Sequence, residues 1–126
     1  MTPGRLLLVE DHPDNLVVLK LLLSDRYQVL GFVSADDALT SLDSFKPDLL
    51  ILDVAMAPID GMQCLHMMRA RPGFDGVPAI ALTALAREVE KQTFLAAGFQ
   101  AVVTKPVLDV RHLEATIDSL LKFGSF

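Results

Sequence analysis

The chain of 126 residues lacks several features that mark particular classes of protein. It has one cysteine, Cys64, so no disulfide can form within the chain, and we expect a protein of the reducing cytoplasm. Its apolar runs, such as residues 16–23 with Lys20 among them, are far shorter than the roughly 18 apolar residues of a membrane-spanning helix. The chain also begins without a basic segment leading into a long apolar stretch, so no signal peptide and no membrane insertion are expected.

Basic residues are scarce as well. The chain has 11 Lys and Arg against 16 Asp and Glu, a net charge of −5, and no basic stripe. Such a chain is poorly suited to direct nucleic-acid binding, because phosphates are neutralised by clustered Lys and Arg. Apolar residues make up 52% of the chain, and a chain of this length buries roughly two-thirds of its unfolded surface on folding. We therefore expect one domain over residues 1–126, with a core of about 5–123.

Short apolar runs alternate with helical segments along the chain. Runs that are apolar almost throughout are typical of strands covered on both faces, and they predict strands at residues 5–10, 48–53, 77–83 and 99–104. Residues 27–33 alternate more and contain Gly31, which favours an edge strand. Helices are predicted between the strands and after the last one, at residues 13–24, 35–44, 62–70, 86–97 and 110–122.

Residues that commonly end helices support these boundaries. Pro13 suits a first helical turn, and Ser34 and Asp37 have the spacing of a capping box. Gly98 fits a left-handed position after a helix, and Asp109 can cap the last helix. Strand and helix thus alternate five times, which predicts an α/β fold: a single doubly wound (βα)5 domain with a five-stranded parallel sheet, flavodoxin-like, in strand order 2-1-3-4-5.

Polar side chains follow four of the predicted strands at the edge where such sheets bind ligands. Glu10 and Asp11 follow the first strand, Asp53 ends the third, Thr83 ends the fourth and Lys105 follows the fifth. Three carboxylates at one edge repel each other unless a cation joins them, and a hard divalent ion, by preference Mg²⁺, suits oxygen ligands. With a lysine, a hydroxyl and a carboxylate nucleophile, the set has the parts for phosphoryl transfer.

Four segments in this order carry a resemblance that covers essentially the whole chain: LLLVEDHPDN (6–15), PDLLILDVAMAPIDGM (47–62), AIALTA (79–84) and LAAGFQAVVTKP (95–106). The sequence resembles the receiver domain of bacterial two-component response regulators, with the fold of the chemotaxis regulators. The resemblance implies that Asp53 accepts a phosphoryl group from a phosphohistidine on a sensor histidine kinase or phosphotransfer protein. It also implies that Asp11, Asp53 and the backbone carbonyl of Ala55 coordinate Mg²⁺, with Glu10 assisting through water.

The resemblance further implies that Thr83 and Lys105 contact the phosphoryl oxygens and that the Lys105–Pro106 bond is cis. The domain would assist its own phosphorylation and dephosphorylation without being a turnover enzyme. The change would be relayed to the outer face formed by residues 86–97, 99–104 and 110–122. A stand-alone regulator and a receiver cut from a larger protein both stay open, since no output domain follows the last predicted helix.

The chain departs from the family pattern at three places. Val102 stands where an aromatic switch residue is usual, which predicts a reduced version of the switching motion. The usual proline after the acceptor is replaced by Ala57, with Pro58 one position later, which puts the loop shape in doubt. Ala55 offers no side-chain function beside the metal.

The first predicted helix is apolar on more than one side. Helical spacing predicts a stripe facing the sheet, made of Asn15, Val18, Leu19, Leu22 and Leu23, with Leu16, Val17 and Leu21 pointing outward. An exposed apolar patch favours docking of a phosphotransfer helix bundle or of a second copy over a merely apolar surface. An output partner also stays open. His12, His66 and His112 have no partner ligands at metal-binding spacing, and no role is assigned to them.

Three other readings compete. A phosphatase of the haloacid dehalogenase type needs an acid two residues after its nucleophile, where this chain has Ala55. A flavodoxin needs a Thr-, Ser- and Gly-rich loop after its first strand, where this chain has Glu10 and Asp11. The stronger alternative is a phosphorylation-independent interaction module on a receiver fold. Only Val102 favours it, because the acidic pair, the acceptor and the lysine are all present.

Overall fold

Five strands and five helices alternate along the chain, as the apolar runs predict. The computed structural model describes residues 3–84, 87–107 and 109–123. The elements are β1 (Arg5–Val9), α1 (Pro13–Leu23), β2 (Gln28–Phe32), α2 (Ala35–Phe45), β3 (Leu49–Asp53), α3 (Gly61–Arg69), β4 (Ala79–Thr83), α4 (Glu88–Ala96), β5 (Ala101–Thr104) and α5 (Val110–Phe123). Each predicted strand is found, one or two residues shorter at one or both ends.

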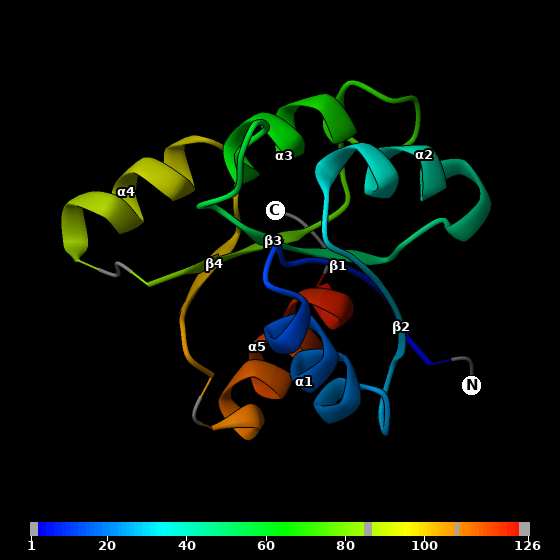
Figure 1. Ribbon diagram of the computed structural model, residues 1–126, viewed down its shortest axis with the longest axis vertical. Coiled ribbons are helices and arrows are strands. Elements are labelled where there is room, and N and C mark those ends of the chain that lie inside the picture. Colours follow the sequence, from blue (N-terminus) through cyan, green and yellow to red (C-terminus); the bar gives the residue numbers. More distant parts are fainter. Residues whose placement is uncertain (1–2, 85–86, 108, 124–126) are drawn as a thin grey trace.

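All five strands are parallel and their order is β2-β1-β3-β4-β5, which confirms the predicted topology. Helices α2, α3 and α4 cover one face of the sheet and α1 and α5 cover the other (Figure 1). The central strands β3 and β4 are buried at every residue, whereas the side chains of the edge strand β2 are half-buried or exposed. Burial on both faces explains why the central strands have no polar alternation.

The sheet separates two apolar cores. Leu7 and Val9 of β1 point into the core under α2 and α3, while Leu6 and Leu8 point into the core under α1 and α5. Cys64 is buried in the first of these cores. No helix within the described residues is long and apolar enough to cross a membrane.

Side-chain caps fix the helix ends close to their predicted positions. The Ser34 hydroxyl accepts a hydrogen bond from the Asp37 N–H, and Asp109 Oδ1 accepts one from the Arg111 N–H. Gly98 has φ +112°, a left-handed value that favours glycine, as predicted. Helix α3 begins one residue earlier than expected, because Asp60 forms a capping box with Gln63. The predicted start of the fourth helix, at residue 86, lies outside the described residues.

The face of α1 that packs on the sheet differs from the prediction. Leu19 and Leu23 are buried and Leu16 is half-buried, whereas Val18 and Leu22 are 55% and 39% exposed. Asn15, also predicted to face the sheet, is exposed. Leu16 lies inward because Gly31 of β2 leaves room for it: a Cβ at Gly31 would lie 2.8 Å from Leu16 Cδ1. The helix is apolar nearly all round, so its sequence could not fix which side is buried.

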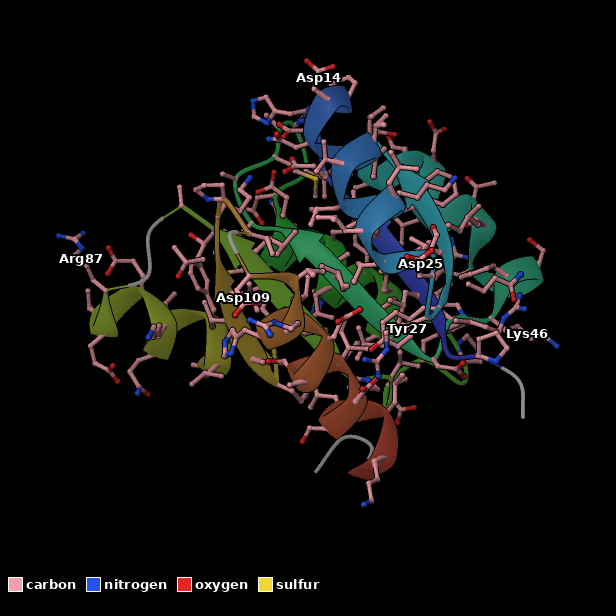
Figure 2. The ribbon with its side chains drawn as sticks, turned by 90° about the horizontal axis from the view of Figure 1, so that it is seen from below. Asp14, Asp25, Tyr27, Lys46, Arg87 and Asp109 are labelled. Carbon is pink, nitrogen blue, oxygen red and sulfur yellow. The ribbon has the colours of Figure 1, made fainter. Side chains whose placement is uncertain are left out.

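Helix α5 is tied to the residues just before β2 by a polar cluster around Tyr27, which Figure 2 labels. The Tyr27 hydroxyl donates its proton to Asp118 Oδ1, and the Glu114 carbonyl lies 3.3 Å away as a more distant acceptor. Arg26 pairs with the side chains of both Glu114 and Asp118. Burial, and then the hydrogen bond to Asp118, raises the pKa of Tyr27. The phenol therefore stays protonated and remains a donor, which holds α5 in place.

Candidate functional site

The polar residues predicted at the strand ends converge in the fold. Parallel strands end at one edge, so Glu10 and Asp11 after β1, Asp53 at the end of β3 and Thr83 at the end of β4 lie along that edge. Glu10, Asp53 and Thr83 are the buried polar or charged side chains among the described residues. Burying polar groups costs free energy unless they have hydrogen-bonding or charged partners, so the burial of these side chains at the strand ends points to a functional site.

Lys105 reaches into this group from the loop after β5. Its Nζ lies 3.2 Å from Glu10 Oε1 and 3.0 Å from Asp53 Oδ2, and its side chain is only 17% exposed. The Lys105 N–H donates to the Thr83 carbonyl, which continues the β4–β5 pairing by one residue. The Lys105–Pro106 bond is cis, as the resemblance implied, and Ala57–Pro58 is a second cis bond that was not predicted.

The carboxyl groups of Glu10 and Asp53 differ in their electrostatics. Burial raises the pKa of Glu10, and its hydrogen bond with Asp53 raises it further. Burial also acts to raise the pKa of Asp53, but hydrogen bonds with Glu10, the Ala55 N–H and Lys105 outweigh it and lower that pKa. Burial opposes the charge on Lys105, yet the two carboxyl groups keep its pKa raised. Asp53 is thus held ionised beside a permanent cation.

The acidic group can also hold a cation. One ligand atom each from Glu10, Asp11, His12 and Asp53 can be chosen so that all four lie within 4.8 Å of one another. Asp11 Oδ1 is a buried oxygen that accepts no hydrogen bond; its neighbour His12 Nδ1 lies 3.1 Å away. Such an oxygen, beside two more carboxyl groups, fits a hard divalent cation, and three carboxylates are the donors that Mg²⁺ prefers.

His12 also lies at this site. The sequence assigns it no role, because it has no partner at metal-ligand spacing along the chain, and the fold places its ring beside Glu10 and Asp11. The available signal was its position directly after the acidic pair, between β1 and α1. The predicted ligand role of the Ala55 carbonyl stays a prediction; the structure shows the Ala55 N–H donating to Asp53 Oδ1 at 3.0 Å.

Comparison with known proteins agrees with this geometry. The family described as response regulator receiver domain matches residues 6–118, most of the chain. The chain belongs to the response regulator receiver domain family. Receiver domains are signalling modules of two-component systems that receive phosphoryl groups from sensor histidine kinases and bind Mg²⁺ in an acidic site.

Three relatives illustrate the range of the family. The chain is 40% identical over 103 residues to an uncharacterized 14.6 kDa protein of Leptolyngbya boryana, covering 81% of this chain and 79% of that protein. It is 33% identical over 107 residues to the sensor protein GacS of Pseudomonas syringae pv. syringae, covering 82% of this chain but only 12% of GacS. A solved structure is that of the receiver domain of the sensor histidine kinase PA1611 from Pseudomonas aeruginosa PAO1, with a magnesium ion coordinated in its active-site cleft. It matches this chain with a TM-score of 0.85 at 27% identity, and the match covers 96% of this chain and 99% of that chain.

Gly61, the first residue of α3, lies against the main chain that follows β3 in the receiver domain. A Cβ at this residue would lie 2.5 Å from the Asp53 carbonyl oxygen and 2.7 Å from Val54 Cα, so any side chain would displace the main chain that follows β3. The Gly61 N–H donates to the Val54 carbonyl, which closes the loop around residues 55–60. The first residue of α3 thereby fixes where Asp53 stands.

We expect Gly61→Ala to destabilise the receiver domain by about 2 kcal/mol, because the added methyl group meets main-chain atoms that cannot move as a side chain could. Urea denaturation would measure the loss, and the amide NMR shifts of Asp53 and Val54 would report the displaced loop. Unchanged stability together with unchanged shifts would show that the loop has room for a side chain.

Proposed function

We propose that this receiver domain is a phosphoacceptor whose nucleophile is Asp53. The observation that carries the proposal is a buried, ionised carboxylate paired with Lys105 at the carboxyl edge of a parallel sheet. A carboxylate oxygen of Asp53 attacks the phosphorus of a phosphohistidine, the phosphorus–nitrogen bond breaks, and its electron pair leaves with the imidazole. The products are an aspartyl phosphate and a free histidine on the donor.

Two side chains are placed to receive the transferred group. Lys105 is a compact cation 3.0 Å from Asp53 Oδ2, so its ammonium can follow the negative charge from the carboxylate to a phosphoryl oxygen. Thr83 ends the neighbouring strand, and its hydroxyl would donate a hydrogen bond to another phosphoryl oxygen. Both interactions strengthen as charge accumulates on the phosphoryl oxygens, which is the condition for catalysis by electrostatic stabilisation.

The proposed metal ligands are Asp11, Asp53 and the Ala55 carbonyl, with Glu10 acting through water. When bound there, Mg²⁺ would neutralise the carboxylates and attract the donor's phosphoryl oxygens. The chain itself contributes two buried acids, Glu10 and Asp53, to the binding of the cation. The single positive charge of Lys105 neutralises only part of their negative charge. The alternative of a phosphorylation-independent interaction module is not favoured. Such a module gives no reason to keep three acids and a lysine together at the carboxyl ends of the strands, where burying them is costly.

Intact-mass measurement after incubation with acetyl phosphate and Mg²⁺ tests the proposal. We expect one added phosphoryl group, and none when EDTA removes the metal. Since a receiver can refuse a small-molecule donor, the same sample is also titrated with beryllofluoride, which imitates a phosphoryl group on a carboxylate. A protein that gains no mass and shows no Mg²⁺-dependent NMR shifts at Asp53 and Thr83 would contradict the proposal.

We further propose that residues 1–126 form one receiver domain and that phosphorylation is relayed to the face of α4, β5 and α5. A depression of about 320 Å³ lies on that face, lined in part by Lys91, Val102 and His112. Val102 is half-buried and packs against the core, so this position offers a smaller moving side chain than an aromatic ring. A reduced switching motion is therefore expected. The proposal includes a cytoplasmic location, since the single cysteine is free.

Helix α1 is the proposed docking surface for the phosphotransfer helices of the donor. Its exposed aliphatic residues are Val17, Val18, Leu21 and Leu22. Val18 and Leu22 line a groove of about 330 Å³ whose other wall includes Lys105 and Pro106. The groove joins the apolar patch to the acceptor site, so a helix lying on α1 would bring its phosphohistidine toward Asp53.

We expect Leu21→Glu to slow phosphotransfer from the cognate donor at least tenfold, because a charge in the centre of an apolar interface is a large energetic cost. Leu21 is 69% exposed, so the domain itself should fold normally. Val89→Glu on α4 is the matched control, since Val89 is 66% exposed on the other face of the sheet. Equal transfer rates to the two variants, with acetyl phosphate labelling intact in both, would contradict docking on α1.

A further inference from the structure

The imidazole of His12 faces the carboxylates of the proposed metal site. Its Nδ1 lies 3.1 Å from Asp11 Oδ1 and 3.6 Å from Glu10 Oε2. The ring is 68% exposed, so solvent and ions reach it freely and core packing does not hold it there. One nitrogen and three carboxylate oxygens, the last from Asp53, thus form a compact group of ligand atoms.

The main chain keeps His12 close to this group. The His12 N–H donates to Glu10 Oε2 at 3.2 Å, and the His12 carbonyl accepts the first hydrogen bond of α1 from the Leu16 N–H. His12 is the N-cap residue of α1, but its side chain makes no capping hydrogen bond. Helix capping therefore does not account for the position of the ring.

Nitrogen and oxygen ligands select different cations. Mg²⁺ prefers oxygen ligands and keeps several waters, whereas imidazole suits first-row transition ions and adds little to Mg²⁺ binding. Aspartate and glutamate oxygens are accepted by both kinds of ion. A site of three carboxylates and one imidazole is consequently better matched to a transition ion such as Mn²⁺ or Co²⁺ than a site of carboxylates alone.

We propose that His12 supplies a nitrogen ligand to the divalent cation of the acceptor site and shifts the preference of that site from Mg²⁺ toward Mn²⁺ and Co²⁺. The inference rests on the proposed function, because the cation is the one held beside Asp53. It assigns His12 to cation selection and not to the transfer step.

Pulsed EPR of bound Mn²⁺ gives a direct test that does not depend on phosphorylation. We expect a nitrogen hyperfine coupling in the native protein and in His66→Ala, a control that removes an exposed histidine of α3. The coupling should be absent in His12→Ala and in His12→Asn, where asparagine can cap α1 and keep its start intact. By calorimetry, both His12 variants should lose roughly tenfold or more in Co²⁺ affinity while their Mg²⁺ affinity stays nearly constant.

Either of two EPR results would overturn the inference about His12 without touching the proposed function: a native spectrum without nitrogen coupling, or a coupling that persists in His12→Ala. Equal losses of Mg²⁺ and Co²⁺ affinity would also overturn it, since they would mean a disturbed loop and not a lost ligand. Failure of the proposed function has a different signature. In that case the native protein binds Mg²⁺ or Mn²⁺ but gains no phosphoryl mass and shows no beryllofluoride shifts, and the results for the His12 variants are unaffected. A native protein that binds no divalent ion would overturn both.

Discussion

Asp53→Asn is expected to abolish phosphoryl addition, leaving no mass increase after incubation with acetyl phosphate and Mg²⁺. The amide keeps the size of the carboxylate but carries no charge and no nucleophilic oxygen. Asp53 also accepts hydrogen bonds from Lys105 and from the Ala55 N–H, so its charge organises the site before transfer. Intact-mass spectrometry would measure the added phosphoryl group, and circular dichroism would confirm that the variant folds.

Asp25→Asn is the matched control for this experiment. Asp25 is exposed and follows α1 at the end opposite Asp14 and the acidic site (Figure 2). The same chemical change there should leave phosphoryl addition at its native level. Full labelling of Asp53→Asn would show that another side chain is the acceptor, and peptide mapping of the modified protein would then locate it.

Lys105→Met is expected to destabilise the domain by about 3 kcal/mol near pH 7, because it leaves two buried acidic groups without their cation. Methionine keeps most of the aliphatic stem, so the loss reports the ammonium and not the packing. The ammonium helps to lower the pKa of Asp53 and opposes the rise in the pKa of Glu10, so its removal shifts both pKa values upward.

The sign of the pH dependence follows from these shifts. Carboxyl groups with raised pKa values bind more protons in the folded than in the unfolded state, so the stability of the variant falls as the pH rises through those values. In the native protein the lowered pKa of Asp53 contributes stability above its unfolded value, which is lost only in more acidic solution. The difference between the two proteins is therefore largest at neutral pH and shrinks as the pH is lowered.

Urea denaturation of the native and variant domains at several pH values would measure this difference. Added Mg²⁺ should recover part of the loss in Lys105→Met, since the ion restores positive charge among the same carboxylates. Lys20→Met removes an exposed lysine of α1, and this variant should match the native protein both without and with Mg²⁺. A deficit that does not change with pH would mean that the lysine stabilises the fold through packing alone.

Much of the site was accessible from the sequence because it lies at strand ends. In a parallel sheet the residue after each apolar run necessarily reaches the same edge, so Glu10, Asp53, Thr83 and Lys105 could be grouped before their distances were known. The helix ends were accessible for a similar local reason: Ser34 and Asp109 cap the main chain of their nearest neighbours. These features depend on contacts that are short in sequence or on strand direction.

Other features required the tertiary structure. Helix α1 is apolar on several sides, so only its docking onto Gly31 decided that Leu16 is half-buried and Val18 exposed. The approach of Gly61 to the Asp53 main chain likewise depends on how α3 enters the fold.

The sequence by itself determined the alternation of strands and helices, the parallel sheet and the set of polar residues at its edge. Periodicity is a local property, and strands that are joined through a helix run parallel. Only the tertiary structure decided how those residues meet, with Lys105 bridging Glu10 and Asp53. Side-chain direction at a loop or helix end is set by neighbours from distant segments, and the order of residues along the chain does not specify it.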